Sequence, residues 1–269
     1  MAQVAALAGW QVRLTDARPD ALPAAFAAIR RNLEASVSRG KVLPEARDAA
    51  LARLETTDSV ASACRGTDLV IEAVVEDLEV KREVFRQAAG VARPDTLLAS
   101  NTSSLSIAAI AAALPGPERV LGLHFFNPVH LMRLVEVVVH RGTSDASLET
   151  ALGVVRGMGK EPIVVKDSPG FASSRLGVAL GLEAMRMLEQ GVADAEDIDK
   201  AMVLGYNHPM GPLRLTDLVG LDVRLKIAEH LHQTLGAEHF RPPDLLRRLV
   251  AEGKLGKKAG QGFYEWGEG

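Results

Sequence analysis

The strongest constraint on the fold of this chain is a series of short, nearly continuous apolar stretches that alternate with segments of helical periodicity. Residues 67–75, TDLVIEAVV, are the clearest of these stretches, since a strand that is apolar on both faces is typical of a parallel sheet covered by helices. The alternation predicts an α/β domain with a mainly parallel, doubly wound sheet. Strands are expected at residues 11–16, 67–75, 96–100, 120–125, 134–139 and 160–166, and helical segments at 2–8, 22–37, 51–54, 78–89, 107–114 and 143–157.

The pattern changes at residues 167–170, DSPG, where proline and glycine interrupt it. Beyond this point the apolar spacing is helical only. We therefore expect an α/β domain at residues 1–167 and an all-helical domain at residues 168–269. Helices are expected at residues 176–190, 195–204 and 221–235, started by Asp194 and Thr216 and ended by Gly191, Gly205 and Gly236.

The helical domain is rich in large apolar side chains, which leaves two interpretations of its surface. Met185, Met187, Leu188 and Met202 are consistent with an ordinary core. They are equally consistent with a face that packs against a second copy of the chain, because helical domains with surplus apolar surface commonly form twofold dimers.

Composition excludes several classes of function. The net charge is −3, from 31 basic and 34 acidic side chains spread evenly, so the chain lacks the basic face expected of a nucleic-acid-binding protein. Its single cysteine, Cys64, cannot form an internal disulfide and indicates a reducing compartment without a metal cluster. Neither a membrane-spanning apolar run nor a signal peptide is evident. We expect a cytoplasmic protein that acts on small molecules.

Asp16 is a candidate for a nucleotide-binding acid. In a Rossmann-type unit, a G-x-G-x-x-G turn is followed about 20 residues later by an acid that holds the adenosine ribose. Counting back from Asp16 places that turn before Met1, so the first strand and its glycine loop are expected to be absent, leaving a gap between the strands at Val12 and Leu69. A carboxylate at this position favours NAD over NADP, although Arg18 lies nearby. The alternative interpretation is that Asp16 is an ordinary turn acid at the end of a strand.

Three segments bring polar groups to the sheet. Residues 100–106, SNTSSLS, follow a strand and open a helix, while His124 and Glu136 lie on two successive strands. One strand pairing would bring the imidazole and the carboxylate into contact, which is the arrangement of a general base. The alternatives are a helix-capping Ser and Thr cluster and a hydrogen-bonded core histidine with a buried acidic partner.

The order of several longer motifs along the chain indicates a function more specifically than these single residues do. The chain resembles the 3-hydroxyacyl-CoA dehydrogenase family over essentially its whole length, through SNTSSLSI, GLHFFNPV, LVEVV, KDSPGF, EDIDKAM, HPMGP and KKAGQGFYEW. The resemblance implies an enzyme of fatty acid metabolism and β-oxidation that interconverts 3-hydroxyacyl-CoA and 3-oxoacyl-CoA with NAD, and a homodimer formed by the helical domain. The alternatives are an inactive homologue without the glycine loop and a hydroxy-acid dehydrogenase whose substrate lacks coenzyme A.

The resemblance also implies roles for individual residues. His124 would be the general base, Glu136 would orient it, and Ser103 would bond the reacting oxygen. Where the family usually has asparagine before arginine this chain has Ser174, which still forms a hydrogen bond but over a shorter reach, so slower chemistry or an altered substrate is expected. The cofactor would contact Asp16, Glu76, Lys81, Asn101, Ser103, Asn127 and Lys258, and coenzyme A would contact Arg39 and Lys41.

Overall fold

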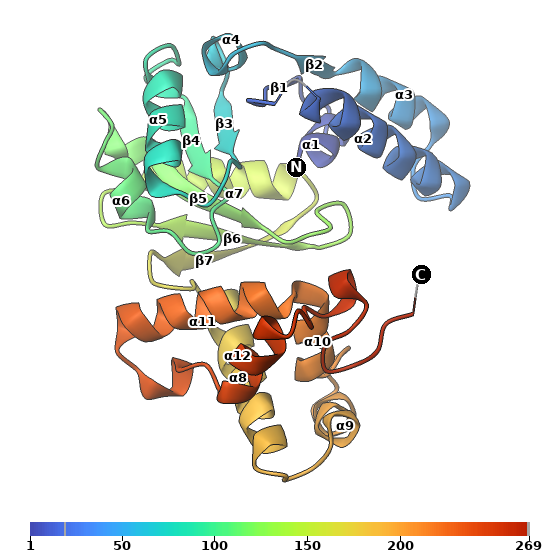
Figure 1. Cartoon of the computed structure of the whole chain (residues 1–269). Coiled ribbons are helices and arrows are strands. Elements are labelled where there is room, and N and C mark those ends of the chain that lie inside the picture. Colours follow the sequence, from blue (N-terminus) through green and yellow to red (C-terminus); the bar gives the residue numbers. More distant parts are fainter. Residues whose placement is uncertain (19, 268–269) are drawn as a thin grey trace. The chain divides into compact units, whose positions relative to one another are not determined.

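A computed structural model of the protein describes residues 1–18 and 20–267. The chain divides into two units, Met1–Asp167 and Ser168–Gly269. The strands β1 to β7 belong to the first unit, and the second is built from helices and short turns (Figure 1). The α/β fold followed by a helical domain, which the sequence predicts, is confirmed.

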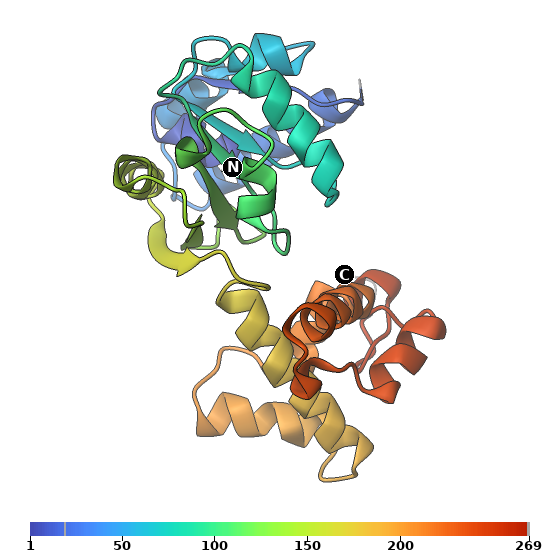
Figure 2. The ribbon, with the colours of Figure 1, turned by 90° about the vertical axis from the view of Figure 1, so that its left-hand side faces the viewer.

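The main sheet of the N-terminal unit has the strand order β3-β4-β5-β6-β7. Strands β3 to β5 are parallel, β6 is antiparallel to β5, and β7 is parallel to β6. Helix α7 covers one face of the sheet, and α5 and α6 lie on the other (Figure 2), so the sheet is doubly wound. The bounds are β3 (Leu69–Glu72), α5 (Leu78–Ala89), β4 (Leu97–Ser100), α6 (Ile107–Ala111), η1 (Pro117–Arg119), β5 (Val120–Phe125), β6 (Leu134–Val139), α7 (Asp145–Gly157) and β7 (Glu161–Lys166).

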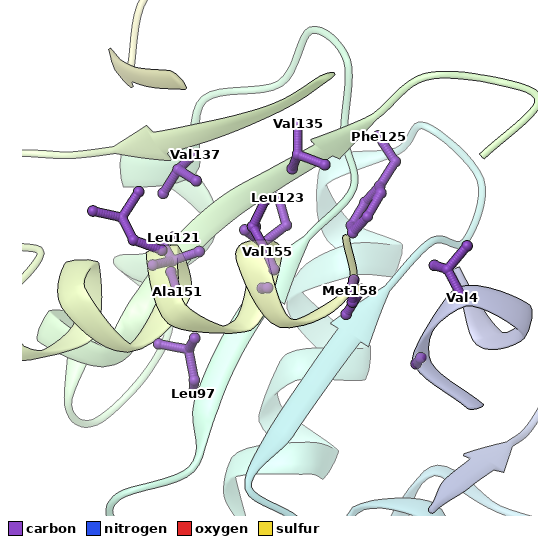
Figure 3. Packing of buried hydrophobic residues seen from close by; sticks show 13 residues of the cluster. Val4, Leu97, Leu121, Leu123, Phe125, Val135, Val137, Ala151, Val155 and Met158 are labelled. Atoms are coloured by element: carbon purple, nitrogen blue, oxygen red, sulfur yellow. The ribbon is translucent and has the colours of Figure 1, made fainter. Parts of the chain in front are cut away.

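The core between the sheet and α7 takes alternate residues of β5 and β6 (Figure 3). Successive side chains of a strand point to opposite faces, so His124 and Glu136 point away from this core. The apolar residues therefore fix which face of the sheet carries the polar pair. The cluster includes Leu97, Leu121, Leu123, Phe125, Val135, Val137, Ala151, Val155 and Met158.

Strands β1 (Val12–Leu14) and β2 (Leu54–Thr56) form a separate parallel pair. Among residues 1–18 and 20–267, no strand joins β1 to β3, so β1 lies outside the main sheet. The expected helical piece at 51–54 is wrong at its end, because Leu54 already pairs with Val12 as the start of β2. The helices around this pair are α1 (Ala2–Leu7), α2 (Ala21–Ser38), α3 (Pro44–Ala52) and α4 (Val60–Cys64).

Strand β3 is shorter than the predicted stretch 67–75. It ends at Glu72, whose side-chain Oε1 accepts a hydrogen bond from the backbone N–H of Val74 at 2.7 Å. This bond turns the chain out of the sheet, and Val75 is 68% exposed. The apolar character of residues 73–75 therefore does not reflect burial in a strand.

The C-terminal unit packs its helices around a second apolar core. Met185 is fully buried there and Met187 and Leu188 pack against the cluster, which makes them core residues. Thr216 does not start a helix as expected: it lies inside α10, and Gly220 precedes α11. The bounds are α8 (Ser173–Glu189), α9 (Ala195–Gly205), α10 (Pro212–Val219), α11 (Leu221–Leu235), η2 (Glu238–Phe240), α12 (Asp244–Ala251) and η3 (Lys257–Ala259).

No helix among the described residues has both the length and the apolar character needed to cross a membrane.

Candidate active site

Strands β5 and β6 place a histidine directly opposite a glutamate. In their antiparallel register His124 pairs with Glu136, and its Nδ1 lies 2.6 Å from Glu136 Oε2. The two side chains are 8% and 0% exposed, and the ring of Phe126 packs 4.6 Å from that of His124. The carboxylate thus holds one ring nitrogen in a site largely shielded from water.

Glu76 organises the loop that follows β4. Its Oε1 accepts hydrogen bonds from Thr102 Oγ1 at 2.5 Å, from Ser104 Oγ at 2.9 Å, and from the backbone N–H groups of Ser103 and Ser104. Burial alone would raise the pKa of Glu76, but the hydrogen bond from Thr102 and the charge of Lys81 outweigh it and lower the pKa below 4.5. Glu76 is therefore held as a carboxylate in the middle of the polar loop.

A buried ion pair lies beneath this loop. Lys81 Nζ donates to Glu72 Oε1 at 2.8 Å and lies 3.3 Å from Glu76 Oε2. Ser100 Oγ donates to the other oxygen of Glu72 at 2.7 Å. Lys81 is 1% exposed, so the structure does not present its ammonium at the surface of the site. Glu72 was not predicted from the sequence, where it is marked only as an acid inside an apolar strand.

Ser103 and the two candidate asparagines, Asn101 and Asn127, differ in the hydrogen bonds that their side chains form. In the part of the chain that the structure describes, the hydroxyl of Ser103 has no hydrogen-bond partner. Asn101 Oδ1 accepts from the backbone N–H of Phe125 at 2.9 Å, which ties the loop to the end of β5. Asn127 is exposed and precedes Pro128 through a cis peptide bond. Ser103 and Asn101 thus lie on the loop that reaches the end of the histidine strand.

Lys160 holds the loop that contains Asn127. Its Nζ donates to the carbonyl oxygens of Val129 and Met132 at 2.5 and 2.8 Å. The residue is 8% exposed, and burial lowers the pKa of its ammonium. Lys160 was not predicted from the sequence either, because its partners are backbone atoms.

Asp16 lies beyond β1, exposed, where Oδ1 accepts the backbone N–H of Arg18 at 2.8 Å. Arg18 Nε is 3.7 Å from the same oxygen. Oδ1 of Asp16 therefore stabilises a turn, in agreement with the alternative interpretation of this residue as a turn acid. Its other oxygen, Oδ2, has no hydrogen-bond partner among the residues described.

Arg39 and Lys41 line a pocket of about 220 Å³ at the end of α2. Its wall is completed by the segment after Pro128, including His130, and no acidic side chain lines it. The pocket suits an anion. Its other lining residues are Asn32, Ala35, Ser36 and Leu131.

Two candidate residues lie in the C-terminal unit. Ser174 is the second residue of α8, and Lys258, in η3, forms an ion pair with Asp222. The side chain of Lys258 is half-exposed at the surface of the helical unit.

The chain matches two family models over nearly its whole length. Residues 1–168 match the model described as "3-hydroxyacyl-CoA dehydrogenase, NAD binding domain", and residues 170–266 match its C-terminal domain. The chain is 44% identical to a 3-hydroxybutyryl-CoA dehydrogenase of Bradyrhizobium diazoefficiens, over 99% of this chain and 90% of that protein.

Solved structures resemble the whole chain. FadB2 of M. tuberculosis has a TM-score of 0.93 and 45% identity, over 98% of this chain and 93% of that one. The (S)-3-hydroxybutyryl-CoA dehydrogenase PaaH1 of Ralstonia eutropha has a TM-score of 0.95 and 37% identity, over 99% and 94% of the two chains.

Proposed function

The chain belongs to the 3-hydroxyacyl-CoA dehydrogenase family, and from that premise we propose how its residues carry out the reaction. The enzyme interconverts a 3-hydroxyacyl-CoA and a 3-oxoacyl-CoA with NAD. The observation that carries the assignment of the base is the 2.6 Å contact between His124 and Glu136.

His124 is the general base. Since Glu136 holds Nδ1, the proton of the substrate's 3-hydroxyl passes to Nε2 while the C3–H bond breaks. NAD, when bound, supplies the acceptor for that hydride. Glu136 fixes the imidazole tautomer and stabilises the imidazolium that forms. Ser103 donates a hydrogen bond to the reacting oxygen, and Ser174 binds the substrate from α8.

The residues present fit a dinucleotide at both of its ends. Ligands of doubly wound sheets bind at the carboxyl edge of the strands, where Glu76 and Asn101 follow β3 and β4 in this chain. We assign these residues and Asn127 to the nicotinamide side, and Oδ2 of Asp16 to the ribose hydroxyls. Lys81 acts through Glu76, because its own ammonium is buried. Lys258 is assigned to the cofactor from the resemblance alone.

The pocket of Arg39, Lys41 and His130 is assigned to the phosphates of coenzyme A. Arginine and lysine bind phosphate oxygens through charge-assisted hydrogen bonds. The absence of acidic side chains from the pocket lining supports this assignment.

The functional oligomer that we propose is a homodimer formed by the helical unit. Several large apolar side chains of this unit are exposed. Leu176 and Leu180 lie one turn apart on α8 and are 72% and 36% exposed, and the exposed residues of α10 are Leu215, Leu218 and Val219. A second copy would cover this apolar face.

We place the enzyme in the cytoplasm, in fatty acid metabolism. The reducing conditions of that compartment suit the free thiol of Cys64.

Replacing His124→Gln tests the assignment. We expect the rate of NAD reduction with 3-hydroxybutyryl-CoA to fall roughly 10²- to 10⁴-fold, the range for a positioned base. Thermal unfolding of both proteins separates this role from a structural one. A folded variant with near-normal turnover would contradict the assignment, and a variant that loses only stability would show that the histidine is a core residue.

A further inference from the structure

Lys160 directly precedes β7, and the register of the sheet places it beside a turn. Strands β6 and β7 are parallel, and they start at the paired residues Leu134 and Glu161. The residue just before β7 therefore lies beside the segment just before β6, which is the turn at residues 128–132. The lysine and the turn both belong to the N-terminal unit.

The ammonium of Lys160 closes this turn. Its Nζ donates to the carbonyl oxygens of Val129 and Met132 at 2.5 and 2.8 Å. Val129 also packs against the apolar core of the sheet, so this side of the turn is anchored twice. The two residues between Val129 and Met132 are His130 and Leu131, which form the tip of the turn.

Charge pairing does not explain a lysine at this position. Lys160 is 8% exposed, burial lowers the pKa of its ammonium, and no carboxylate is paired with it in the part of the chain that the structure describes. Burying an ammonium is costly, and neutral carbonyl oxygens offset the cost only in part. An apolar side chain of similar length would fill the space without that cost. The contribution of Lys160 is therefore its pair of hydrogen bonds to the turn.

The tip of the turn forms one wall of the pocket of about 220 Å³ at the end of α2. His130 and Leu131 line this wall, while Arg39 and Lys41 line the pocket from the end of α2 and the segment after it. His130 forms no hydrogen bond to any other described residue, so its place depends on the backbone of the turn. The shape of the pocket thus depends on the bonds that close the turn.

We propose that Lys160 is a positioning residue for the coenzyme A substrate: by closing the turn at residues 128–132, it keeps His130 and Leu131 in the wall that meets the phosphate-bearing part of coenzyme A. The inference rests on the assignment of this pocket to coenzyme A in the proposed function. A preformed wall binds its ligand without the entropy loss of ordering a loose loop. Lys160 acts through the turn and is not assigned a contact with the substrate.

The test compares the 3-hydroxybutyryl thioesters of coenzyme A and of pantetheine, because pantetheine lacks the phosphates and the adenosine. With the full chain and NAD, the ratio of the two kcat/KM values measures what the pocket contributes. This ratio does not depend on the fraction of folded protein. We expect Lys160→Met to lower the ratio roughly 10-fold or more, the effect of losing hydrogen bonds from a charged group, through a higher KM for the coenzyme A thioester at similar kcat.

Further variants separate the bonds to the turn from other effects of the change. Lys160→Arg keeps a charged donor and should retain most of the ratio. If Lys160→Met does not fold, Lys160→Gln, which keeps a neutral donor, should still lower the ratio, by a smaller factor. The control Lys166→Met, at an exposed residue of the same strand, should match the wild type. Combining Lys160→Met with His130→Ala should lower the ratio by less than the product of the single effects, because both changes act on the same wall.

The outcomes distinguish this inference from the proposed function. A Lys160→Met variant with the wild-type ratio would overturn the inference and leave the proposed function intact. A wild type that uses the two thioesters equally well would overturn the assignment of the pocket to coenzyme A, and the inference with it. A Lys160→Met variant that loses kcat/KM by the same factor with both thioesters would show that the lysine supports the fold as a whole, and this result would also overturn the inference.

Discussion

Glu72 and Lys81 form an ion pair that does not reach solvent: the side chains are 0% and 1% exposed, with 2.8 Å between Oε1 and Nζ. The same ammonium lies 3.3 Å from Glu76, and Ser100 donates to the free oxygen of Glu72. One cation therefore ties together the end of β3, the end of β4 and the loop that carries Ser103. The resemblance implied a cofactor contact for Lys81, whereas its surroundings favour a supporting role.

Replacing Lys81→Met should destabilise the protein strongly. The change leaves the buried Glu72 without its counter-ion, and breaking a buried pair from one side costs about 3–5 kcal/mol. Urea unfolding measures the loss. The control Arg133→Met removes an exposed pair with Glu161 and should cost less than about 1 kcal/mol. Equal stability of the Lys81→Met variant and the wild type would show that the ion pair does not support the loop.

Glu76 should make the protein less stable in acid. Its pKa is lowered in the folded state from an ordinary value of 4.5, so its stabilising contribution is complete above pH 4.5 and is lost as the pH falls through the lower folded value. We expect the melting temperature of Glu76→Gln to fall less steeply than that of the wild type below pH 4.5. The exposed variant Glu55→Gln serves as control. Parallel curves for Glu76→Gln and the wild type would contradict this explanation.

The polar pair was predictable because it depends on a simple rule. Two successive strands with alternating side chains place His124 and Glu136 on one face, and only their register had to be right. Glu72 was not predictable from the sequence, because no periodicity distinguishes an acid within a continuous apolar stretch. Its partner Lys81 lies on a helix beyond a turn, so the contact arises only from the tertiary fold.

Short elements were also hard to predict. Strand β2 has three residues and exists through its pairing with β1. Helices α10 and α12 have eight residues each and thus about two turns of apolar repeat. Tertiary packing decides such elements, and local sequence does not. The burial of Arg224, which is 6% exposed in the helical unit, was missed for the same reason, because burial of a charged residue is not visible in a sequence.

Asp16 should determine the choice of cofactor. If its free oxygen binds the ribose hydroxyls, Asp16→Ala should raise the KM for NAD roughly 10-fold or more, the effect of losing a hydrogen bond to a charged group, and should reduce the preference over NADP. Steady-state kinetics with both cofactors measures this. Asp48→Ala, at an exposed ion pair with Arg47, is the matched control. An unchanged KM would leave Asp16 as a turn-forming residue only.

Leu176 should be essential for the proposed dimer. Its side chain is 72% exposed on α8, and a charge there would be buried without a partner if a second copy covers this face. We expect light scattering to show a dimer for the wild type and a monomer for Leu176→Glu. Leu43→Glu, at a residue 71% exposed in the N-terminal unit, should remain dimeric. A monomeric wild type, or a dimeric Leu176→Glu variant, would contradict the proposal.

Glu136→Gln should separate orientation of the base from the base itself. A neutral amide can still hydrogen-bond to Nδ1 of His124, but it does not stabilise the imidazolium formed on proton transfer. We expect kcat to fall roughly 10²- to 10⁴-fold with little change in KM, since Glu136 is fully buried and is not assigned a substrate contact.

The pH dependence of the Glu136→Gln variant distinguishes this role from a loss of packing. With a weakened base, hydroxide takes over part of the proton abstraction, so kcat should rise steadily with pH, whereas a packing defect would lower kcat equally at every pH. The control Glu161→Gln, at an exposed residue of β7, should behave like the wild type. A Glu136→Gln variant with wild-type kcat and pH profile would show that the carboxylate does not assist His124.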